Sequence, residues 1–243
     1  MKAYKRNITL GYIFFLHLLV VVIIAKSDVL PKVKKHLGVL TSEITPHYKK
    51  MITYHKRMDS SVPDNAVIFI GDSITEALAT AAITDKSVNY GIGGDTTYGV
   101  LNRISLYKSL DRVKLVVIAV GVNDLNRREN NEILNNYSKI LQKIPKNTNI
   151  LISSILPIAN GYKYSNPKYN DRIYNINKSL ELLSKSFENV YFLDTSNKLL
   201  NKDGALKKSY HIGDGLHLSK EGYKVWIDSL SLAITKIEYQ LKK

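Results

Sequence analysis

The sequence predicts an α/β domain built on a parallel β-sheet. Five short apolar runs alternate with segments of helical periodicity, and continuous apolar runs are typical of strands buried on both faces. A closing amphipathic segment at 219–241 predicts a last helix that packs one face against the sheet. The length of 243 residues suits one such domain with a short extension. The predicted strands are 66–70, 87–90, 114–120, 149–155 and 189–193.

The N-terminus carries an apolar run long enough to span a membrane. Residues 8–25 read ITLGYIFFLHLLVVVIIA, follow three basic residues, and contain no Asp, Glu, Lys or Arg and one histidine, His17. A helix of this run reaches roughly 27 Å, close to the thickness of the hydrocarbon core of a bilayer. A cleavable signal peptide is the alternative, although its apolar part is usually shorter and ends at small residues. We expect residues 1–25 to be an uncleaved membrane anchor, and the protein to be secreted if the segment is cleaved.

The charge of the chain is concentrated beside this run. Of the net charge of +14, residues 1–57 carry +9. Basic side chains there fit anionic lipid headgroups, so no nucleic-acid partner is expected. Residues 26–63, with a helical pattern near 47–58, are predicted to be a basic juxtamembrane connector that precedes a domain at 64–243. The layout of a signal anchor favours a domain outside the cytoplasm, in the cell envelope.

Four polar clusters lie at the ends of predicted elements. In parallel sheets, ligands bind beyond the carboxyl ends of the strands, so these clusters are expected to form one pocket. Absence of cysteine excludes disulfides and Cys-ligated zinc. The clusters are Gly71-Asp72-Ser73, GIGGDTT at 91–97, GVND at 121–124 and GDGLHLS at 213–219.

Taken singly, each cluster has a simpler explanation. Turn formation accounts for a Gly-Asp pair after a strand and for Asn123 beside Asp124. The GIGGDTT glycines lack the third glycine of a dinucleotide fingerprint, where Thr96 stands. Asp214 and His217 could be a structural pair or half of a metal site, but no second cluster has ligand spacing. We therefore expect neither a metal nor an organic cofactor.

Together and in this order, the clusters resemble the motif blocks of the SGNH, or GDSL, hydrolase family. The resemblance covers about residues 45–240 and includes GDSIT, NYGIGGDTTYGVLNRI, GVND and DGLHLS. The second block is similar to that of acetylhydrolases of the platelet-activating-factor type. The resemblance implies a three-layer αβα, flavodoxin-like fold with a five-stranded parallel sheet. It places the family's roles on Ser73, Gly94, Asn123, Asp214 and His217.

The chemistry explains why these residue types are needed. A serine hydroxyl is a poor nucleophile at neutral pH, so Ser73 needs a base within hydrogen-bond reach, and His217 is that candidate. Asp214 can accept the proton on the other imidazole nitrogen and fix the tautomer. Asp72 is the rival carboxylate and His211 the rival base. We expect Asp72 to organise the loop, and we rank His211 below His217.

An oxyanion hole must place donors where negative charge develops. The backbone N–H of Ser73 lies at the start of a predicted helix, whose dipole favours negative charge. Gly94 lacks a Cβ, so its N–H could approach closely. Asn123 offers a side-chain amide. These three donors are the expected oxyanion hole.

The sequence therefore predicts a membrane-anchored serine esterase that cleaves a short, acetyl-type ester, with a glycan or cell-wall sugar as the expected substrate. The loop PIANGYKYSNPKYN at 157–170 is polar, and its tyrosines could stack on sugar rings or simply pack on the surface. An O-acyltransferase that uses the same acyl-enzyme, a lysophospholipase or thioesterase, and a catalytically silent binding module remain alternatives. The oligomeric state is not predicted.

Overall fold

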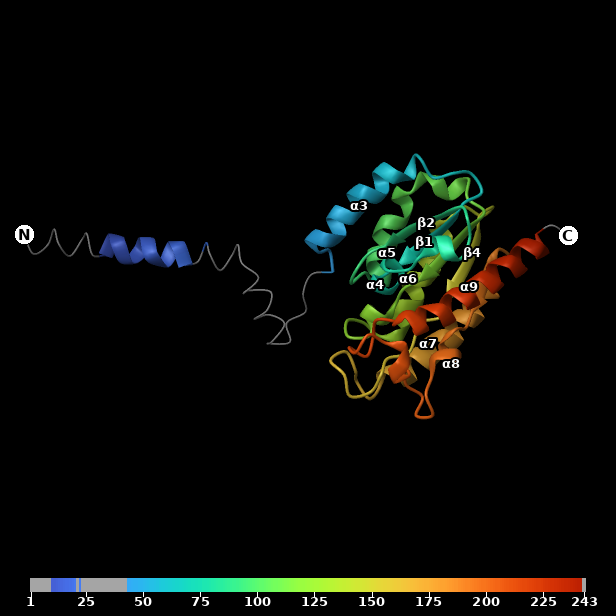
Figure 1. The fold of residues 1–243 in the computed structure, drawn as a ribbon. Helices are drawn as coiled ribbons and strands as arrows, with labels where there is room; N and C mark the ends of the chain where they lie inside the picture. Colours follow the sequence, from blue (N-terminus) through green and yellow to red (C-terminus); the bar gives the residue numbers. More distant parts are fainter. Residues whose placement is uncertain (1–9, 21, 23–42, 242–243) are drawn as a thin grey trace, which may run out of the picture. The chain divides into compact units, whose positions relative to one another are not determined.

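The computed structural model describes residues 10–20, 22 and 43–241 (Figure 1). The chain divides into two units, Met1–Ser42 and Glu43–Lys243. In the first unit, residues 10–20 are helical. Residues 1–9, 21 and 23–25 of the predicted anchor and 26–42 of the predicted connector lie outside the described residues. Within the described ranges, no helix is both long enough and apolar enough to cross a membrane.

A five-stranded sheet forms the centre of the second unit, in the order β2-β1-β3-β4-β5. Every neighbouring pair is parallel, which confirms the predicted five-stranded parallel sheet. The three inner strands consist almost entirely of buried apolar side chains, as expected for a sheet covered on both faces. The strands are β1 Val67–Gly71, β2 Ser87–Gly91, β3 Leu115–Ala119, β4 Asn149–Ser153 and β5 Val190–Leu193.

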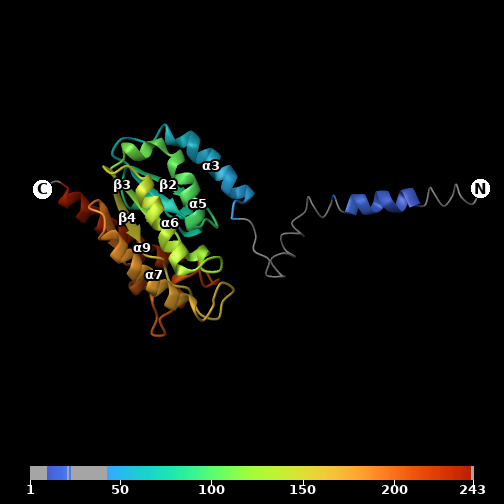
Figure 2. The same ribbon diagram turned by 180° about the vertical axis from the view of Figure 1, so that it is seen from behind.

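Helices cover both faces of this sheet. Helices α5, α6 and α7 pack in sequence against one another over one face, which Figure 2 shows from the front. Helix α9 lies over the opposite face (Figure 1), where the Trp226 indole donates a hydrogen bond to the Ser153 hydroxyl at 3.0 Å. These helices are α5 Thr97–Arg103, α6 Asn130–Lys143, α7 Tyr169–Ser184 and α9 Lys220–Gln240. The short helix α4 Ser73–Glu76 precedes α5, and the short helix α8 Ser196–Leu199 lies between α7 and α9 in the chain.

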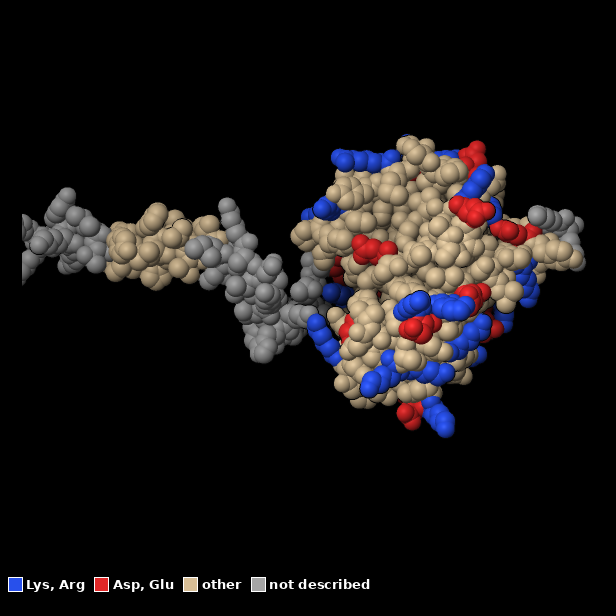
Figure 3. Space-filling view, in the orientation of Figure 1, with Lys and Arg blue, Asp and Glu red and all other residues tan. Residues whose placement is uncertain are grey.

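Charged side chains are mixed on the face of the molecule shown in Figure 3. Lys and Arg side chains lie interspersed with Asp and Glu side chains over α9 and the elements beside it. One origin of this mixture is the ion pair Lys224–Asp228, one turn apart on α9. This face therefore carries no uninterrupted basic patch.

The register brings the ends of three central strands to one level. Gly71 at the end of β1 pairs with Gly91 at the end of β2 and with Ala119 at the end of β3. A Cβ on Gly91 would lie 2.2 Å from the backbone nitrogen of Glu76, so glycine is needed for α4 to pass this closely. The polar segments that follow these strands consequently leave the sheet side by side.

Helix α3 (Pro46–Asp59) belongs to the second unit, although the sequence pattern predicts that this segment is part of the connector. Tyr48 and His55 are buried, and the Tyr48 hydroxyl donates to the carbonyl of Gly99 at 2.7 Å. Asp59 is also buried and accepts hydrogen bonds from both the backbone and the hydroxyl of Ser109. The described unit therefore begins at Glu43, because the buried polar side chains of α3 have their partners in the α/β domain.

Asp72 turns the chain from β1 into α4. Its carboxylate accepts the backbone N–H of Ile74 at 3.0 Å, which caps the first turn of the helix. The side chain is almost completely buried. Burial raises the pKa of Asp72 to about 7, with a smaller contribution from the nearby carboxylates of Asp95 and Asp124. This capping role agrees with the loop-organising function expected from the sequence.

Replacing Asp72 with asparagine should change how stability depends on pH. Since the folded state raises this pKa, the stability that Asp72 contributes is fully present below its ordinary pKa and is lost as the pH rises through about 7. Relative to Asp72→Asn, the wild-type free energy of unfolding should fall by about 3 kcal/mol between about pH 5 and about pH 8. Urea unfolding at the two pH values measures this difference.

The control is Asp85→Asn, which changes an exposed carboxylate in the same way. Its free energy of unfolding should track the wild type at both pH values. A wild-type minus Asp72→Asn difference that stays constant across this range would show that the buried carboxyl is not protonated near neutral pH.

Candidate active site

Ser73 and His217 meet at the carboxyl end of the sheet although they lie far apart in the sequence. The Ser73 hydroxyl lies 3.0 Å from His217 Nε2, and both side chains are half-buried. Ser73 begins α4 directly after the Asp72 cap, while His217 lies on the turn that leads into α9. The hydroxyl can therefore donate its proton to the imidazole while its oxygen remains accessible from the surface.

Asp214 holds the other side of the imidazole. Its Oδ2 lies 2.5 Å from His217 Nδ1, and its Oδ1 accepts the backbone N–H groups of Leu216 and His217, each at 3.0 Å. Partial burial alone would raise the pKa of Asp214, but the hydrogen bonds from His217 and from these N–H groups outweigh it and hold the pKa below its ordinary value. An ionised Asp214 assigns the ring proton to Nδ1 and leaves Nε2 as the acceptor for Ser73.

Gly94 lies in the turn that follows β2, whose last residue pairs with the last residue of β1. Its φ of +76° lies in the left-handed region that favours glycine. A Cβ at this position would meet no atom within 4 Å, so the backbone conformation, rather than a close approach, explains the glycine. Within residues 43–241, no group accepts the Gly94 N–H, which leaves it available to a ligand.

Asn123 and the Ser73 N–H complete the set of donors expected from the sequence. Asn123 Nδ2 donates one hydrogen to the carbonyl of Asp95 at 2.9 Å, so the amide retains a second hydrogen. The Ser73 N–H is at the first position of α4 and has no acceptor within that helix. Because α4 is only four residues long, its dipole adds little, and the N–H group itself is the relevant donor.

Asp124 fastens the segment that carries Asn123 to the segment that carries Gly94. It is fully buried, and its carboxylate accepts the backbone N–H of Thr97 at 2.9 Å and the Thr97 hydroxyl at 2.5 Å. Arg128 adds an ion pair to the same carboxylate at 2.6 Å. The sequence pattern indicates only a turn at Asp124, whereas the fold shows that its carboxylate binds Thr97, 27 residues away.

His211, the rival base, has a different place. The structure pairs Ser73 with His217, whereas His211 is buried and its Nδ1 accepts the backbone N–H groups of Gly213 and Gly215. A ring nitrogen used in this way is not available to accept the serine proton. His211 therefore braces the turn that carries Asp214 and His217.

The loop at 157–170 lies against this turn. Tyr162 packs edge-on to His211 with ring centroids 4.6 Å apart, and Tyr164 lies edge-on to His217 at 6.0 Å. The backbone N–H of Ala159 also donates to the carbonyl of Gly215 at 2.8 Å. The loop therefore lies beside the histidine, and Tyr162 is packed against His211.

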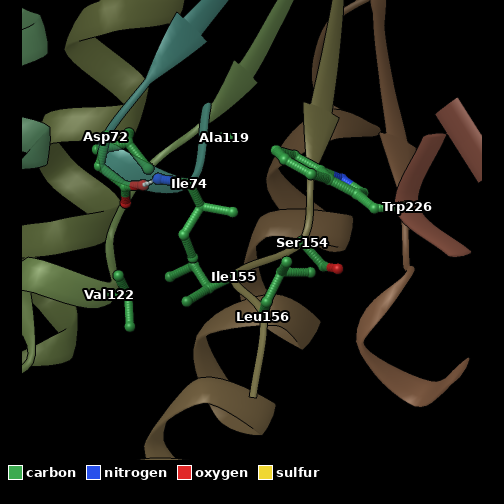
Figure 4. Close-up of a pocket in the computed structure, with 9 residues that line it drawn as sticks. Asp72, Ile74, Ala119, Val122, Ser154, Ile155, Leu156 and Trp226 are labelled. Atoms are coloured by element: carbon green, nitrogen blue, oxygen red, sulfur yellow. Dashed lines mark hydrogen bonds between the residues drawn. The ribbon is translucent and has the colours of Figure 1, made fainter. Parts of the chain in front are cut away.

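A small cavity with mostly apolar walls adjoins the nucleophile turn (Figure 4). Its volume is about 20 Å³, room for roughly one water-sized group. The neighbours of Ser73 and Asn123 in the sequence, Ile74 and Val122, both line it, and Figure 4 shows Ile155 directed toward Ile74. The remaining lining residues are Asp72, Ala119, Val120, Ser154, Leu156 and Trp226.

Comparison with known proteins identifies the family of the chain. Residues 69–225 match the GDSL-like Lipase/Acylhydrolase family. The human platelet-activating factor acetylhydrolase IB subunit alpha2 is 30% identical over 190 residues, which cover 72% of this chain and 79% of that protein. The corresponding alpha1 subunit of Rattus norvegicus is 27% identical over 188 residues, covering 72% and 78% of the two chains.

Solved structures give the same result at the level of the fold. A Streptococcus pneumoniae protein described as a candidate platelet activating factor superposes with a TM-score of 0.69 at 32% identity, covering 76% of this chain and 91% of the other. A carbohydrate esterase family 3 structure from Talaromyces cellulolyticus superposes with a TM-score of 0.55 at 15% identity, covering 71% and 97%. This second likeness concerns the fold alone. With the four motif blocks gathered at one end of its sheet, the chain belongs to the GDSL-like lipase/acylhydrolase, or SGNH hydrolase, family.

Proposed function

We propose that the chain is a serine esterase that cleaves a short acyl ester through an acyl-enzyme. The observation that carries this proposal is the continuous hydrogen-bonded relay from Ser73 through His217 to Asp214. Such a relay provides the base that a serine hydroxyl needs, and it orients that base. Two further donors, Gly94 N–H and the Asn123 amide, lie on the adjoining segments.

The residues have defined roles in each half of the reaction. Ser73 Oγ attacks the ester carbonyl carbon while its proton passes to His217 Nε2, and the charge that Asp214 carries stabilises the resulting imidazolium. Collapse of the tetrahedral intermediate breaks the bond to the leaving alkoxide, which takes the proton from His217. A water molecule then attacks the acyl-enzyme, with His217 as its base, and releases the acid and free Ser73.

Negative charge develops on the former carbonyl oxygen in both acylation and deacylation, so the oxyanion donors act in both steps. The proposed donors are Ser73 N–H, Gly94 N–H and Asn123 Nδ2. Loss of one such donor costs roughly 3 kcal/mol in the transition state. Asn123 is the member of this set that mutation can remove without altering the backbone.

A cavity lined by Asp72 and Ile74, the residues on either side of Ser73 in the sequence, supports a short acyl group. Its walls are largely apolar, as an acyl chain requires, and its volume of about 20 Å³ suits a methyl group better than an alkyl chain. Ile155, which follows β4, and Trp226 of α9 are among the residues that line it (Figure 4). We therefore propose an acetyl-type ester as the substrate.

The residues beside His217 favour a sugar as the alcohol component of the ester substrate. Tyr164 belongs to the polar loop at 157–170, is half-buried and lies edge-on to His217. Aromatic rings with one polar end commonly bind sugars, which have apolar faces and polar rims. The proposal is therefore an O-acetylated glycan, and the fold shared with a carbohydrate esterase is compatible with it.

Membrane attachment is a second part of the proposal. The apolar run at 8–25 and the basic residues around it support an anchor that holds the esterase in the cell envelope, outside the cytoplasm. This location would bring the active site to cell-wall glycans.

Loss of either Ser73 or His217 should abolish hydrolysis. Ser73→Ala and His217→Ala should each lower kcat for nitrophenyl acetate by about 10⁴-fold or more, and the double variant should be scarcely worse, because the two residues act as a unit. Asp214→Asn should lose less than His217→Ala if the carboxylate mainly orients the ring. Ser60→Ala, which removes an exposed hydroxyl, is the matched control. Substantial turnover by Ser73→Ala would contradict the proposal.

Activity should decline steeply with acyl length. In a series of nitrophenyl esters from acetate to palmitate, kcat/KM should fall beyond about four carbons because the cavity excludes longer chains. Ile155→Ala enlarges the cavity and should shift the preference toward butyrate and hexanoate. Leu180→Ala removes a buried side chain of α7 instead, and should lower stability without changing the preference.

A preference for octanoate or longer chains would overturn the acetyl proposal and favour a lysophospholipase or thioesterase. Acetate release from an O-acetylated polysaccharide tests the sugar directly. Transfer of the acetyl group to an added sugar, in place of acetate release, would instead identify an acyltransferase.

The anchor is tested by fractionating cells that express the full chain. The protein should sediment with membranes, resist a salt wash and be reached by protease added outside intact cells. Replacing Leu16 and Leu19 with lysine should release it, because charge in the apolar run prevents insertion. Soluble wild-type protein, or a mature N-terminus near Lys26, would contradict an uncleaved anchor.

A further inference from the structure

Arg103, on α5, is completely buried although its side chain is charged. Its Nε donates to Asp95 Oδ2 at 2.8 Å, and Nη1 donates to the Tyr107 hydroxyl at 2.9 Å. Its Nη2 donates to the carbonyl of Gly71 at 3.2 Å. One guanidinium therefore contacts the last residue of β1, just before the nucleophile turn, and the segment that follows Gly94.

Asp95 extends this connection to the proposed oxyanion donors. It directly follows Gly94, and its backbone carbonyl accepts the Asn123 amide at 2.9 Å. Its Oδ1 accepts the N–H of Thr96 at 2.9 Å, so both carboxylate oxygens have partners. Movement of Asp95 would consequently displace the N–H of Gly94 and the amide of Asn123 together.

Tyr107 links the guanidinium of Arg103 to His55 on helix α3. The Tyr107 hydroxyl accepts from Arg103 and can donate its own proton to His55 Nδ1 at 3.1 Å. Burial, together with the charge of Arg103, lowers the pKa of His55 to about 3, so this imidazole is neutral and can accept. The Tyr90 ring packs against both of these side chains, with its centroid 4.6 Å from that of His55 and 4.6 Å from that of Tyr107.

A buried ion pair is an expensive way to stabilise a core. Burial opposes the charge of Arg103, and the Asp95 carboxylate outweighs this and raises the arginine pKa. Well-packed apolar residues often stabilise a core as well as such a pair, so the geometry that the pair imposes is the better explanation for it. Arginine can impose it because its planar fork donates in fixed directions to several acceptors at once.

We infer that Arg103, paired with Asp95, is a positioning residue that sets the distance between the nucleophile turn and the oxyanion hole. The inference rests on the proposed function and adds residues that contact neither substrate nor reacting atoms. Lysine would keep the charge but could not reach Asp95, Tyr107 and Gly71 together.

The test measures catalysis per functional active site. Arg103→Lys, Asp95→Asn and Tyr107→Phe are purified as full-length protein, and competent serines are counted by fluorophosphonate titration. For Arg103→Lys and Asp95→Asn, kcat per titrated serine for nitrophenyl acetate should fall at least about tenfold, with KM within about twofold, because donors are misplaced rather than removed. Tyr107→Phe, which leaves the ion pair intact, should have a smaller effect in the same direction.

A second readout isolates the oxyanion hole. The affinity for a trifluoromethyl ketone, whose adduct with the serine carries the oxyanion, should fall in parallel with kcat. A residue that only stabilises the fold would lower the melting temperature and the fraction of titratable serine, and would leave both quantities unchanged at the serines that remain.

Arg112→Lys is the matched control. Arg112 also donates to backbone carbonyls, those of Asp59 and Val62, and to a carboxylate, that of Asp64, but it lies at the opposite end of the strands. It should lower the melting temperature without changing kcat per titrated serine.

The outcomes separate this inference from the proposed function. If Arg103→Lys does not fold, Asp95→Asn, which keeps the size of the side chain, decides. Unchanged kcat and ketone affinity in the variants of an active wild type overturn the positioning role alone. A wild type that neither hydrolyses the ester nor reacts with the fluorophosphonate overturns both.

Discussion

The register of the parallel sheet is the constraint on which the site depends. Gly71 pairs with Gly91 and with Ala119, so β1, β2 and β3 end at one level. The nucleophile turn, the Gly94 segment and the Asn123 segment therefore leave the sheet next to one another. A shift of one residue in any of these pairings would move a segment along the strand axis by roughly 3.3 Å, more than a hydrogen bond tolerates.

The ends of the strands do not by themselves fix the positions of the segments that follow them. Buried carboxylates hold these segments in place. Asp124 ties the Asn123 segment to the first residue of α5, and Asp95 ties the Gly94 segment to Arg103. Asp72 caps α4 from within the β1 turn. Burying three carboxylates near one another opposes their charge, which the raised pKa of Asp72 reflects. The buried carboxylates lower the stability of the fold, but they hold the oxyanion-hole donors in place before substrate binds.

Local patterns in the sequence predicted the strands well, because buried parallel strands are continuous apolar runs. They also indicated that the four polar clusters follow strands or precede a helix, because turns need specific residues. Such local patterns could not predict the hydrogen-bond partners of the buried polar side chains, because these partners are distant in the sequence. Arg103 reads as one basic residue on a short helix, and nothing near it in the sequence indicates Asp95 or Gly71 as acceptors. Helix α3 was assigned to a connector for the same reason: His55 and Asp59 find their partners about 50 residues away.

The central claim, that this geometry forms an acyl-enzyme on Ser73, is tested most directly by trapping the intermediate. The full-length protein is mixed with excess nitrophenyl acetate, quenched in acid during turnover and digested for peptide mass spectrometry. The account predicts one acetyl group on the peptide that contains Ser73, absent from Ser73→Ala. Turnover without any acetylated peptide, or with the acetyl group on another residue, would contradict it.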